Sequence, residues 1–300
     1  MPAVSDQWSR WVIGTRFGGD VEAAKAGMHS LYGIRDQVLE HAQLGEGSVV
    51  LDVGAGDGLI AFGALDRSGA AGQVIFSDVS QALLDHSAEL AEQMGVRDRC
   101  RFVHASADNL QPIADSSVDA VTTRSVLIYV TDKPAAIREF YRVLKPGGRI
   151  ALFEPISRIV SGQPENRWGW QGYDVTPVMD LAGRMKMIFQ QWASVQASMT
   201  DFDDRDLLGV CEAAGFSEIH LELHVDIQPP QPQKWDTMIN SPGNPLVPSL
   251  AEVMAQIFTP EEAARFEAHL RPQVEKGLGR HRSAFVYVWA TKDAQDDRPV

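Results

Sequence analysis

The chain has 300 residues, of which 44 % are hydrophobic and 22 % are charged, as in an ordinary soluble globular protein. Its 40 acidic and 27 basic side chains give a net charge of −13, which disfavours nucleic-acid and anionic-lipid partners. No apolar run is long enough to span a membrane, and the first residues lack a secretory-signal pattern. We therefore expect a cytoplasmic protein without nucleic-acid or membrane partners.

The N-terminal residues predict two helices, at 5–17 and 20–44. Gly18 and Gly19 separate them, and Asp20 has the side chain of an N-cap. We interpret residues 1–44 as a helical cap that precedes the rest of the fold.

Strand and helix patterns alternate in the next hundred residues. Helices are expected at 80–94 and 133–144, and short apolar runs predict strands at 48–53, 73–77, 101–104, 118–122 and 149–153. A turn at Lys145–Gly148 separates the second helix from the last of these strands. This alternation is typical of the α/β class, with a doubly wound and mostly parallel sheet.

The alternation lapses twice further along the chain. A helix at 177–197 lies in the first interruption, and a helix capped by Thr259 lies in the second, which is rich in proline. A helix at 205–214 and strands at 218–225 and 284–290 resume the pattern. The resulting division is an N-terminal cap at 1–44, a nucleotide-binding core at 45–156, a lid insertion at 157–204, a core continuation at 205–228, a second insertion at 229–281, a last core strand at 282–292 and a flexible tail at 293–300.

A glycine-rich loop follows the first strand. Gly54, Gly56 and Gly58 stand where the chain must turn sharply from a strand into a helix, so that the backbone can approach a ligand closely. A dinucleotide fingerprint would have its third glycine one residue later, at Leu59. The acids Asp52 and Asp57 also suit a cationic or neutral ligand better than a pyrophosphate.

Polar residues follow the next two strands. Asp78, twenty residues after Gly58, can accept hydrogen bonds from both hydroxyls of a ribose. Asp108 and Asn109 come after the third strand and can bind an exocyclic amine. Because parallel strands end at one edge of a sheet, the pattern predicts a nucleoside along that edge.

Taken together, these motifs resemble those of the class I S-adenosylmethionine (SAM)-dependent methyltransferases. The matching stretches are 52–58, Asp78, 107–109, 119–122 and 144–148. The resemblance implies a Rossmann-like sheet of seven strands, the last antiparallel, with SAM as the cofactor. It also implies SAM contacts for Asp52, Gly54, Ala55, Gly56, Gly58, Asp78, Val79, Ala107, Asp108, Asn109, Arg124 and Ser125. The pattern looks closest to the small-molecule methyltransferases of the ubiquinone and arsenite type, although the cysteines of the arsenite enzymes are missing.

The acceptor is expected under the cap and the two insertions, which hold many of the aromatic side chains. Methyl transfer would be an in-line displacement to a small molecule in an aromatic pocket. Candidate bases are Tyr129 and His29. Candidate acceptor-binding residues are Tyr32, Glu154, Arg167, Trp168, Trp170, Tyr173 and Asp174.

Two alternative functions stay open at this point. A NAD(P)-dependent oxidoreductase shares the ribose-binding acid, and a SAM-binding protein without turnover shares the whole cofactor motif. Either a monomer or a homodimer is compatible with the sequence. The chain has two cysteines outside any metal-binding pattern, and the group His220, Glu222 and His224 lacks a fourth ligand, so no metal is expected.

Overall fold

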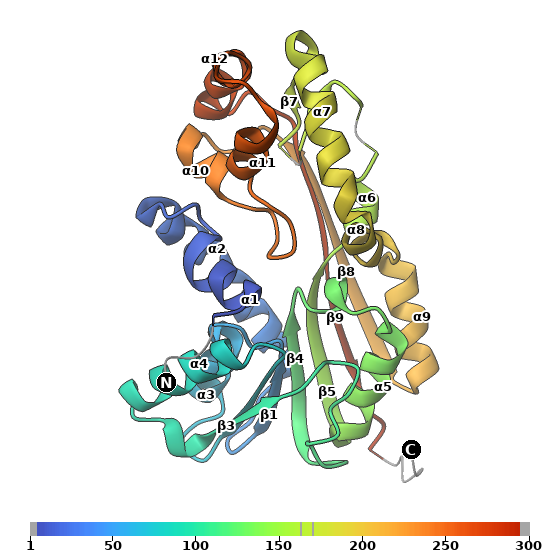
Figure 1. Ribbon diagram of the computed structural model, residues 1–300. Coiled ribbons are helices and arrows are strands. Elements are labelled where there is room, and N and C mark those ends of the chain that lie inside the picture. The colour runs from blue at the N-terminus through green and yellow to red at the C-terminus, as the bar shows by residue number, and fades with distance from the viewer. Residues whose placement is uncertain (1–4, 163, 170, 295–300) are drawn as a thin grey trace.

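The computed structural model describes residues 5–162, 164–169 and 171–294. Its centre is a seven-stranded sheet in the order β3-β2-β1-β4-β5-β9-β8 (Figure 1). The strands are β1 Val49–Val53, β2 Gln73–Asp78, β3 Cys100–His104, β4 Val118–Arg124, β5 Leu144–Pro155, β8 Ser217–Gln228 and β9 His281–Thr291. Strands β1 to β5 run parallel to one another, and β9 is antiparallel to both β5 and β8. The predicted α/β class, with a mostly parallel sheet and an antiparallel last strand, is confirmed.

Helices cover both faces of this sheet, because its central strands are apolar on both sides. One layer consists of α2 Val21–Ala42, α3 Leu59–Arg67 and α4 Gln81–Gln93. The other consists of α5 Lys133–Val143 and α9 Asp204–Ala214. The chain crosses from one layer to the other between β3 and β4, so the carboxyl ends of β1 and β4 border a crevice in which α/β proteins bind ligands.

Several predicted caps and turns have a clear physical basis. The Asp20 side chain accepts hydrogen bonds from the backbone N–H groups of Glu22 and Ala23, which fixes the start of α2. Gly215 ends α9 with a φ of 98°. The turn at 145–148 differs from the expectation, because it is a bulge inside β5 and not a break before it: Val118 pairs with Leu144, and Ala120 pairs with Arg149.

The first predicted helix is interrupted early. One turn of α-helix, α1 Gln7–Ser9, continues as the π-helix η1 Arg10–Thr15, in which the Arg16 N–H donates to the Trp11 carbonyl oxygen at 2.9 Å. The wider turn of a π-helix alters which side chains share a face, a feature common at functional sites. Here Trp8, Trp11 and Val12 all face one cavity.

The two insertions, residues 157–204 and 229–281, form a layer above the carboxyl edge of the sheet, which we call the lid (Figure 1). Its elements are α6 Ser157–Val160, β6 Arg167–Trp168, β7 Tyr173–Asp174, η4 Thr176–Val178, α7 Met179–Phe189, η5 Gln190–Trp192, α8 Ala193–Thr200, α10 Trp235–Asn240, α11 Leu250–Ile257 and α12 Pro260–Lys276. Leu181 and Met185 of α7 share a hydrophobic core with Val253 of α11 and Phe266 of α12. The insertions are therefore one packed unit, although the strand β8 separates them in the sequence.

Within the lid, the helix expected at 177–197 is divided by η5 into α7 and α8, and α10 and α11 were not expected among the prolines. Short 3-10 helices also occur elsewhere, at η2 Arg97–Arg99 and η3 Leu127–Tyr129. Of the tail predicted to be flexible, residues 295–300 lie outside the described residues. None of the described helices is long and apolar enough to cross a membrane.

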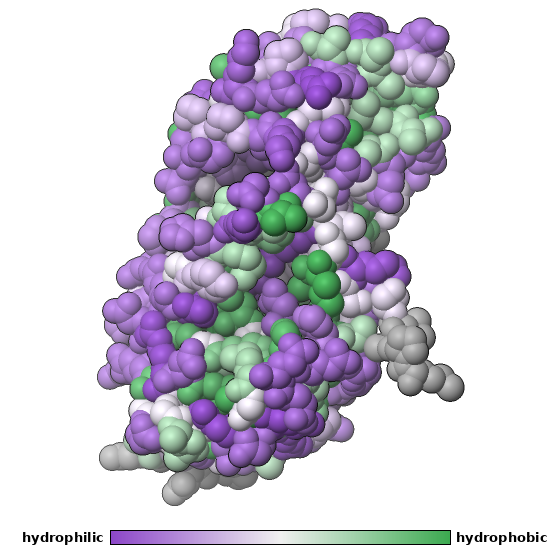
Figure 2. All heavy atoms as spheres, turned by 90° about the vertical axis from the view of Figure 1, so that its left-hand side faces the viewer, coloured by the Kyte–Doolittle hydropathy of each residue, from purple (hydrophilic) through white to green (hydrophobic). Residues whose placement is uncertain are grey.

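Strands β8 and β9 extend beyond the rest of the sheet toward the lid (Figure 1). Strand β5 ends at Pro155, which pairs with Phe285, but β9 continues to pair with β8 as far as His281 opposite Gln228. A two-stranded ribbon thus carries α10 to α12. The surface on the side of the N-terminal helices is mostly hydrophilic, with hydrophobic residues showing along its middle (Figure 2).

Candidate functional site

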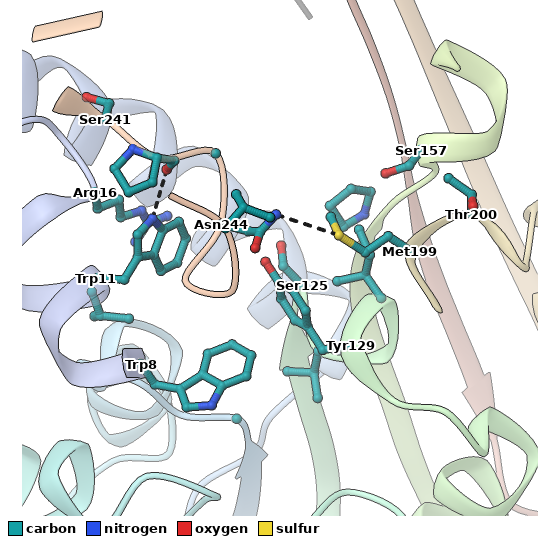
Figure 3. Close-up of a pocket in the computed structure, with 18 of the residues that line it drawn as sticks. Trp8, Trp11, Arg16, Ser125, Tyr129, Ser157, Met199, Thr200, Ser241 and Asn244 are labelled. Carbon is teal, nitrogen blue, oxygen red and sulfur yellow. Dashed lines mark hydrogen bonds between the residues drawn. The ribbon is translucent and has the colours of Figure 1, made fainter. Parts of the chain in front are cut away.

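A cavity of about 1290 Å³ lies between the carboxyl edge of the sheet, the N-terminal helices and the lid (Figure 3). Its walls come from four separate parts of the chain. Side chains of α1 and η1 line one side, the loops after β1 to β5 line the base, and both lid insertions line the remainder. The cavity is therefore a product of the tertiary fold and belongs to no single segment.

The glycine loop after β1 borders the cavity through Gly54 and Gly56. Gly54, Gly56 and Gly58 have φ angles of 66°, 56° and 81°, in the left-handed region that favours glycine. A Cβ atom at Gly54 would lie 2.4 Å from Cγ2 of Val126, so a side chain there would clash with the segment after β4. Ala55 is buried, and neither it nor Gly58 is among the residues that line the cavity.

Asp78 ends β2 at the edge of the cavity, and Val79 follows it. The Asp78 carboxylate accepts one hydrogen bond from the Gly56 N–H at 2.9 Å and another from the Ser80 N–H at 2.8 Å. Burial raises the pKa of this carboxyl. The predicted ribose-binding acid and the glycine loop are thus joined directly by a hydrogen bond.

A hydrogen bond holds the N-terminal cap next to Asp78. The Ser80 hydroxyl donates to the Asp6 carboxylate at 2.6 Å, and the same carboxylate caps α1 by accepting from the Ser9 N–H at 2.8 Å. The start of the described chain therefore closes one side of the Asp78 region.

Asp52 lies beneath the glycine loop, only 2 % exposed, and does not line the cavity. Its carboxylate accepts from the Thr122 hydroxyl at 2.8 Å and from the Ala61 N–H at 3.1 Å, which ties β1 to β4 and α3. Burial raises its pKa to about 7. Asp52 was expected to contact the cofactor; its side chain supports the glycine loop from behind.

The loop after β3 brings Ala107 and Asp108 to the cavity. The Ser106 hydroxyl donates a short hydrogen bond to the Asp108 carboxylate. Asn109, which was expected beside Asp108, is exposed and is absent from the lining. Ser106 and Asn109 form an isolated backbone bridge, and the side chains of Asp108 and Asn109 point in different directions from this turn.

Glu154 organises the segment after β4. Its buried carboxylate accepts backbone N–H hydrogen bonds from Val126 at 2.9 Å, Leu127 at 2.9 Å and Ile128 at 3.2 Å. Burial raises its pKa to about 7. Glu154 was expected to orient an acceptor, but it is 1 % exposed and does not line the cavity, because it holds η3 in place.

Arg124, Ser125 and Tyr129 line the cavity from this same segment. Tyr129 packs edge-on against Trp8, with ring centroids 5.0 Å apart. Burial raises the pKa of Tyr129 to about 12, so its hydroxyl is protonated at neutral pH. A protonated phenol can donate a hydrogen bond to a ligand in the cavity.

In the lid, Arg167 and Trp168 line the cavity as expected. Tyr173 and Asp174, on the partner strand β7, do not. Tyr173 is 1 % exposed within the lid core. The Asp174 carboxylate accepts from the N–H and the hydroxyl of Thr176, which stabilises the turn that leads into η4.

Two other candidates do not line the cavity. His29 is exposed on α2 and is not part of the lining. Tyr32, 44 % exposed on the same helix, has the Arg35 guanidinium 4.8 Å from its ring centroid. Trp170 lies outside the described residues.

Some lining residues were not singled out from the sequence. Arg16 lies at the end of η1, Phe189 ends α7, and Asn244 lies in the loop between α10 and α11. Hydrogen bonds join this loop to both sides of the cavity: the Trp11 indole N–H donates to the Pro242 carbonyl oxygen at 3.0 Å, and the Asn244 amide donates to the Met199 sulfur at 3.8 Å (Figure 3). The composition of the loop carries no local signal for these contacts.

Among the described residues, no group of three His, Cys, Asp or Glu side chains could hold a metal ion. His220 instead stacks on Trp289, with ring centroids 5.2 Å apart, and His224 stacks on Phe285 at 5.0 Å. The histidines of β8 therefore pack against the neighbouring strand.

The fold and the site define a class I SAM-dependent methyltransferase, with a glycine loop after β1, a carboxylate at the end of β2 and an antiparallel last strand. The chain belongs to the ubiE/COQ5 methyltransferase family, whose model matches residues 24–226. The protein is thus a SAM-dependent methyltransferase.

Curated relatives agree with this assignment. The chain is 29 % identical over 193 residues to the ubiquinone/menaquinone biosynthesis C-methyltransferase UbiE of Idiomarina loihiensis, with 64 % of this chain and 75 % of the relative covered. It is 33 % identical over 166 residues to UbiE of Pseudomonas putida, with 55 % of this chain and 61 % of the relative covered. The alignment thus spans less than two thirds of the Pseudomonas protein.

Among solved structures, the fold is similar to that of phosphoethanolamine N-methyltransferase 2 of Haemonchus contortus in complex with phosphomonomethylethanolamine and S-adenosylhomocysteine. The TM-score is 0.53 at 15 % identity, with 95 % of this chain and 56 % of the other covered. The matched family region, in contrast, begins after η1 and ends before α10. Part of the cavity wall therefore lies outside it.

Proposed function

We propose that this methyltransferase transfers the methyl group of SAM to an apolar, ring-containing small molecule held between the sheet edge and the lid. The observation that carries this proposal is one continuous cavity of about 1290 Å³, lined by the glycine loop at one end and by aromatic side chains elsewhere. Pockets for a single small ligand usually measure about 300–1,000 Å³. The volume supports a cofactor and an acceptor side by side.

The residues of the sheet edge fit the cofactor. When bound, SAM supplies a methyl group already activated by its sulfonium. Gly54 and Gly56 line the cavity with backbone alone, and Asp78 offers a carboxylate to ribose hydroxyls. Asp108 provides an acceptor for an amino group at the far end.

The acceptor part of the cavity fits a flat apolar molecule. Trp8, Tyr129, Trp168 and Phe189 provide ring faces and edges, and the described lining there holds no carboxylate. Enclosure by these side chains excludes water and orients the acceptor, which can supply much of the acceleration of an in-line transfer. The name of the UbiE relatives makes precursors of ubiquinone and menaquinone the first acceptors to test.

Calorimetry with S-adenosylhomocysteine and NAD tests the cofactor part of the proposal. Wild-type protein is expected to bind S-adenosylhomocysteine and not to bind NAD. Asp78→Ala should lose this binding, whereas Asp85→Ala, on α4 and outside the cavity lining, should keep it. Binding of NAD alone would overturn the proposal, and unchanged affinity in Asp78→Ala would overturn the ribose assignment.

Transfer of a labelled methyl group from SAM to a panel of acceptors tests the second part. Apolar ring compounds are expected to be methylated, and polar aliphatic amines are not. A panel in which only the amines react would contradict the proposed acceptor class.

A further inference from the structure

Charge is distributed unevenly around the cavity. Among its described lining residues, the only acids are Asp78 and Asp108, and both lie at the ends of cofactor-side strands. Four basic residues also line it: Arg16, Arg124, Arg167 and Lys186. The cavity thus has more basic than acidic lining residues, although the whole chain has a net charge of −13.

Arg16 is the most unusual of these cations. Its Nη1 atom is buried and has no hydrogen-bond partner in the described part of the chain. Its guanidinium lies 5.3 Å from the ring centroid of Trp11 and 5.4 Å from that of Phe17. Burial lowers the pKa of Arg16 to about 10, so the side chain is still charged at neutral pH.

Some arginines elsewhere in the described structure have carboxylate partners, and others donate to backbone carbonyl oxygens. Arg142 pairs with Glu139 at 2.7 Å, and Arg184 pairs with Glu262 at 2.5 Å. Neither Arg16 nor Arg124 forms an ion pair with a carboxylate of any described residue, although the charge of Asp57 raises the pKa of Arg16. Arg16 is half-buried, and a charge with a buried, unpartnered Nη1 atom and no counter-ion is costly, so this position favours an incoming anion.

The neighbours of Arg16 strengthen this preference. Arg124 lies near enough for its charge to lower the Arg16 pKa, so two like charges border the same space. The protonated hydroxyl of Tyr129 is a further donor at this place. Two guanidinium groups and a hydroxyl make a donor set suited to a carboxylate.

We propose that Arg16 and Arg124, assisted by the Tyr129 hydroxyl, bind a carboxylate inside the cavity. This inference rests on the proposed function, because the carboxylate is that of the cofactor's methionine part or one carried by the acceptor. Both sources require the same chemistry at Arg16. They differ in the ligand that loses affinity when the guanidinium is removed.

The first arm of the test uses two cofactor analogues. S-adenosylhomocysteine carries the amino-acid carboxylate, whereas 5′-methylthioadenosine has the same nucleoside without it. Calorimetry compares wild type with Arg16→Gln, Arg16→Lys and Arg10→Gln. Arg10 is exposed on the same π-helix and is not in the lining, so it is the matched control.

If the carboxylate belongs to the cofactor, Arg16→Gln should lower the affinity for S-adenosylhomocysteine about 10–100-fold, the usual effect of losing a charged hydrogen bond. Its affinity for 5′-methylthioadenosine should stay unchanged. Arg16→Lys should keep part of the affinity, because the charge remains, and Arg10→Gln should match wild type. Circular dichroism of each variant verifies that it is folded.

The second arm addresses the acceptor. Protein saturated with S-adenosylhomocysteine is titrated with 1-naphthoate and with the neutral 1-naphthamide. If the acceptor supplies the carboxylate, wild type prefers the naphthoate, and Arg16→Gln loses this preference.

Folded Arg16→Gln that binds S-adenosylhomocysteine, 5′-methylthioadenosine and 1-naphthoate as wild type does would overturn the inference and leave the proposed function intact. Wild-type protein that binds neither adenosine compound would overturn the proposed function itself. The two failures are therefore distinguishable.

Discussion

The indole ring of Trp8 meets the phenol ring of Tyr129 edge-on, with ring centroids 5.0 Å apart and ring planes at 84°. Trp8 belongs to α1, and Tyr129 belongs to the segment after β4, 121 positions later in the chain. The contact joins the N-terminal helix to the sheet edge beside the cavity. It is one of the few points that hold this helix over the site.

Replacing Trp8 by alanine should open this side of the cavity. Aromatic pairs of this geometry contribute about 0.5–1.5 kcal/mol beyond burial, so the affinity for S-adenosylhomocysteine should fall about 2–10-fold. Methyl transfer should fall further, because water enters the cavity. Trp8→Phe keeps a ring and should retain most of both. Equal turnover by Trp8→Ala and wild type would show that the contact does not close the site.

Gly54→Ala should abolish cofactor binding as well as destabilise the fold. Its Cβ atom would lie 2.4 Å from Val126, in addition to the cost of a positive φ, about 1–3 kcal/mol. Gly95→Ala is a matched control, because Gly95 has a φ of 68° and nothing within 4 Å of an added Cβ. Both variants should lower the free energy of unfolding in urea, and only Gly54→Ala should lose S-adenosylhomocysteine. Normal binding of S-adenosylhomocysteine by Gly54→Ala would show that the glycine loop does not contact the cofactor.

The stability of the protein should depend on the titration of Glu154. Burial raises its folded pKa from 4.5 to about 7, so the folded state holds a proton that the unfolded state releases between these values. The stabilising effect is complete below pH 4.5 and is lost as pH rises through about 7. Glu154→Gln cannot titrate, so wild type should lose about 3 kcal/mol of unfolding free energy relative to it across this window.

Urea unfolding of both proteins from about pH 5.5 to 8.5 measures most of this difference. Asp52, whose pKa is also raised to about 7, is present in both proteins and cancels in the comparison. Parallel pH profiles for wild type and Glu154→Gln would contradict the assigned titration.

Lys133→Met should loosen the lid helix α8. The Lys133 ammonium donates to the carbonyl oxygens of Val130 at 3.0 Å and Ser198 at 3.1 Å, and to the Asp201 carboxylate at 2.7 Å. Loss of these bonds should increase amide hydrogen exchange in residues 193–200 and leave the sheet protected. Lys145→Met removes the Lys145–Asp119 pair at the opposite end of the sheet and should not affect α8. Unchanged exchange in Lys133→Met would show that α8 is held by other contacts.

The sheet and the cofactor side of the cavity were the predictable parts of this protein. A buried parallel strand such as β1, Val49–Val53, is a short apolar run whatever surrounds it. Asp78 meets the glycine loop because both end adjacent parallel strands, β2 and β1. Spacing along the chain is enough to place such residues.

The acceptor side could not be predicted in this way. Arg16 ends η1 and His29 lies within α2, but only Arg16 lines the cavity, because packing on other elements decides which side faces inward. Glu154 and Tyr173 have the polar groups of binding residues, yet both are buried as supports. Helices α10 and α11 were missed because prolines 229, 230, 232, 242, 245 and 248 indicate loops locally.

The ribbon formed by the ends of β8 and β9 limits how the enzyme can release its product. Two hydrogen-bonded strands resist bending at a single residue, so we expect the helices that they carry to move by torsion of the ribbon and not by a hinge. The N-terminal helix is held instead by a few side-chain contacts, of which Asp6 to Ser80 and Trp11 to Pro242 are two. We therefore expect product to leave the cavity more easily past the N-terminal helices than by movement of the lid.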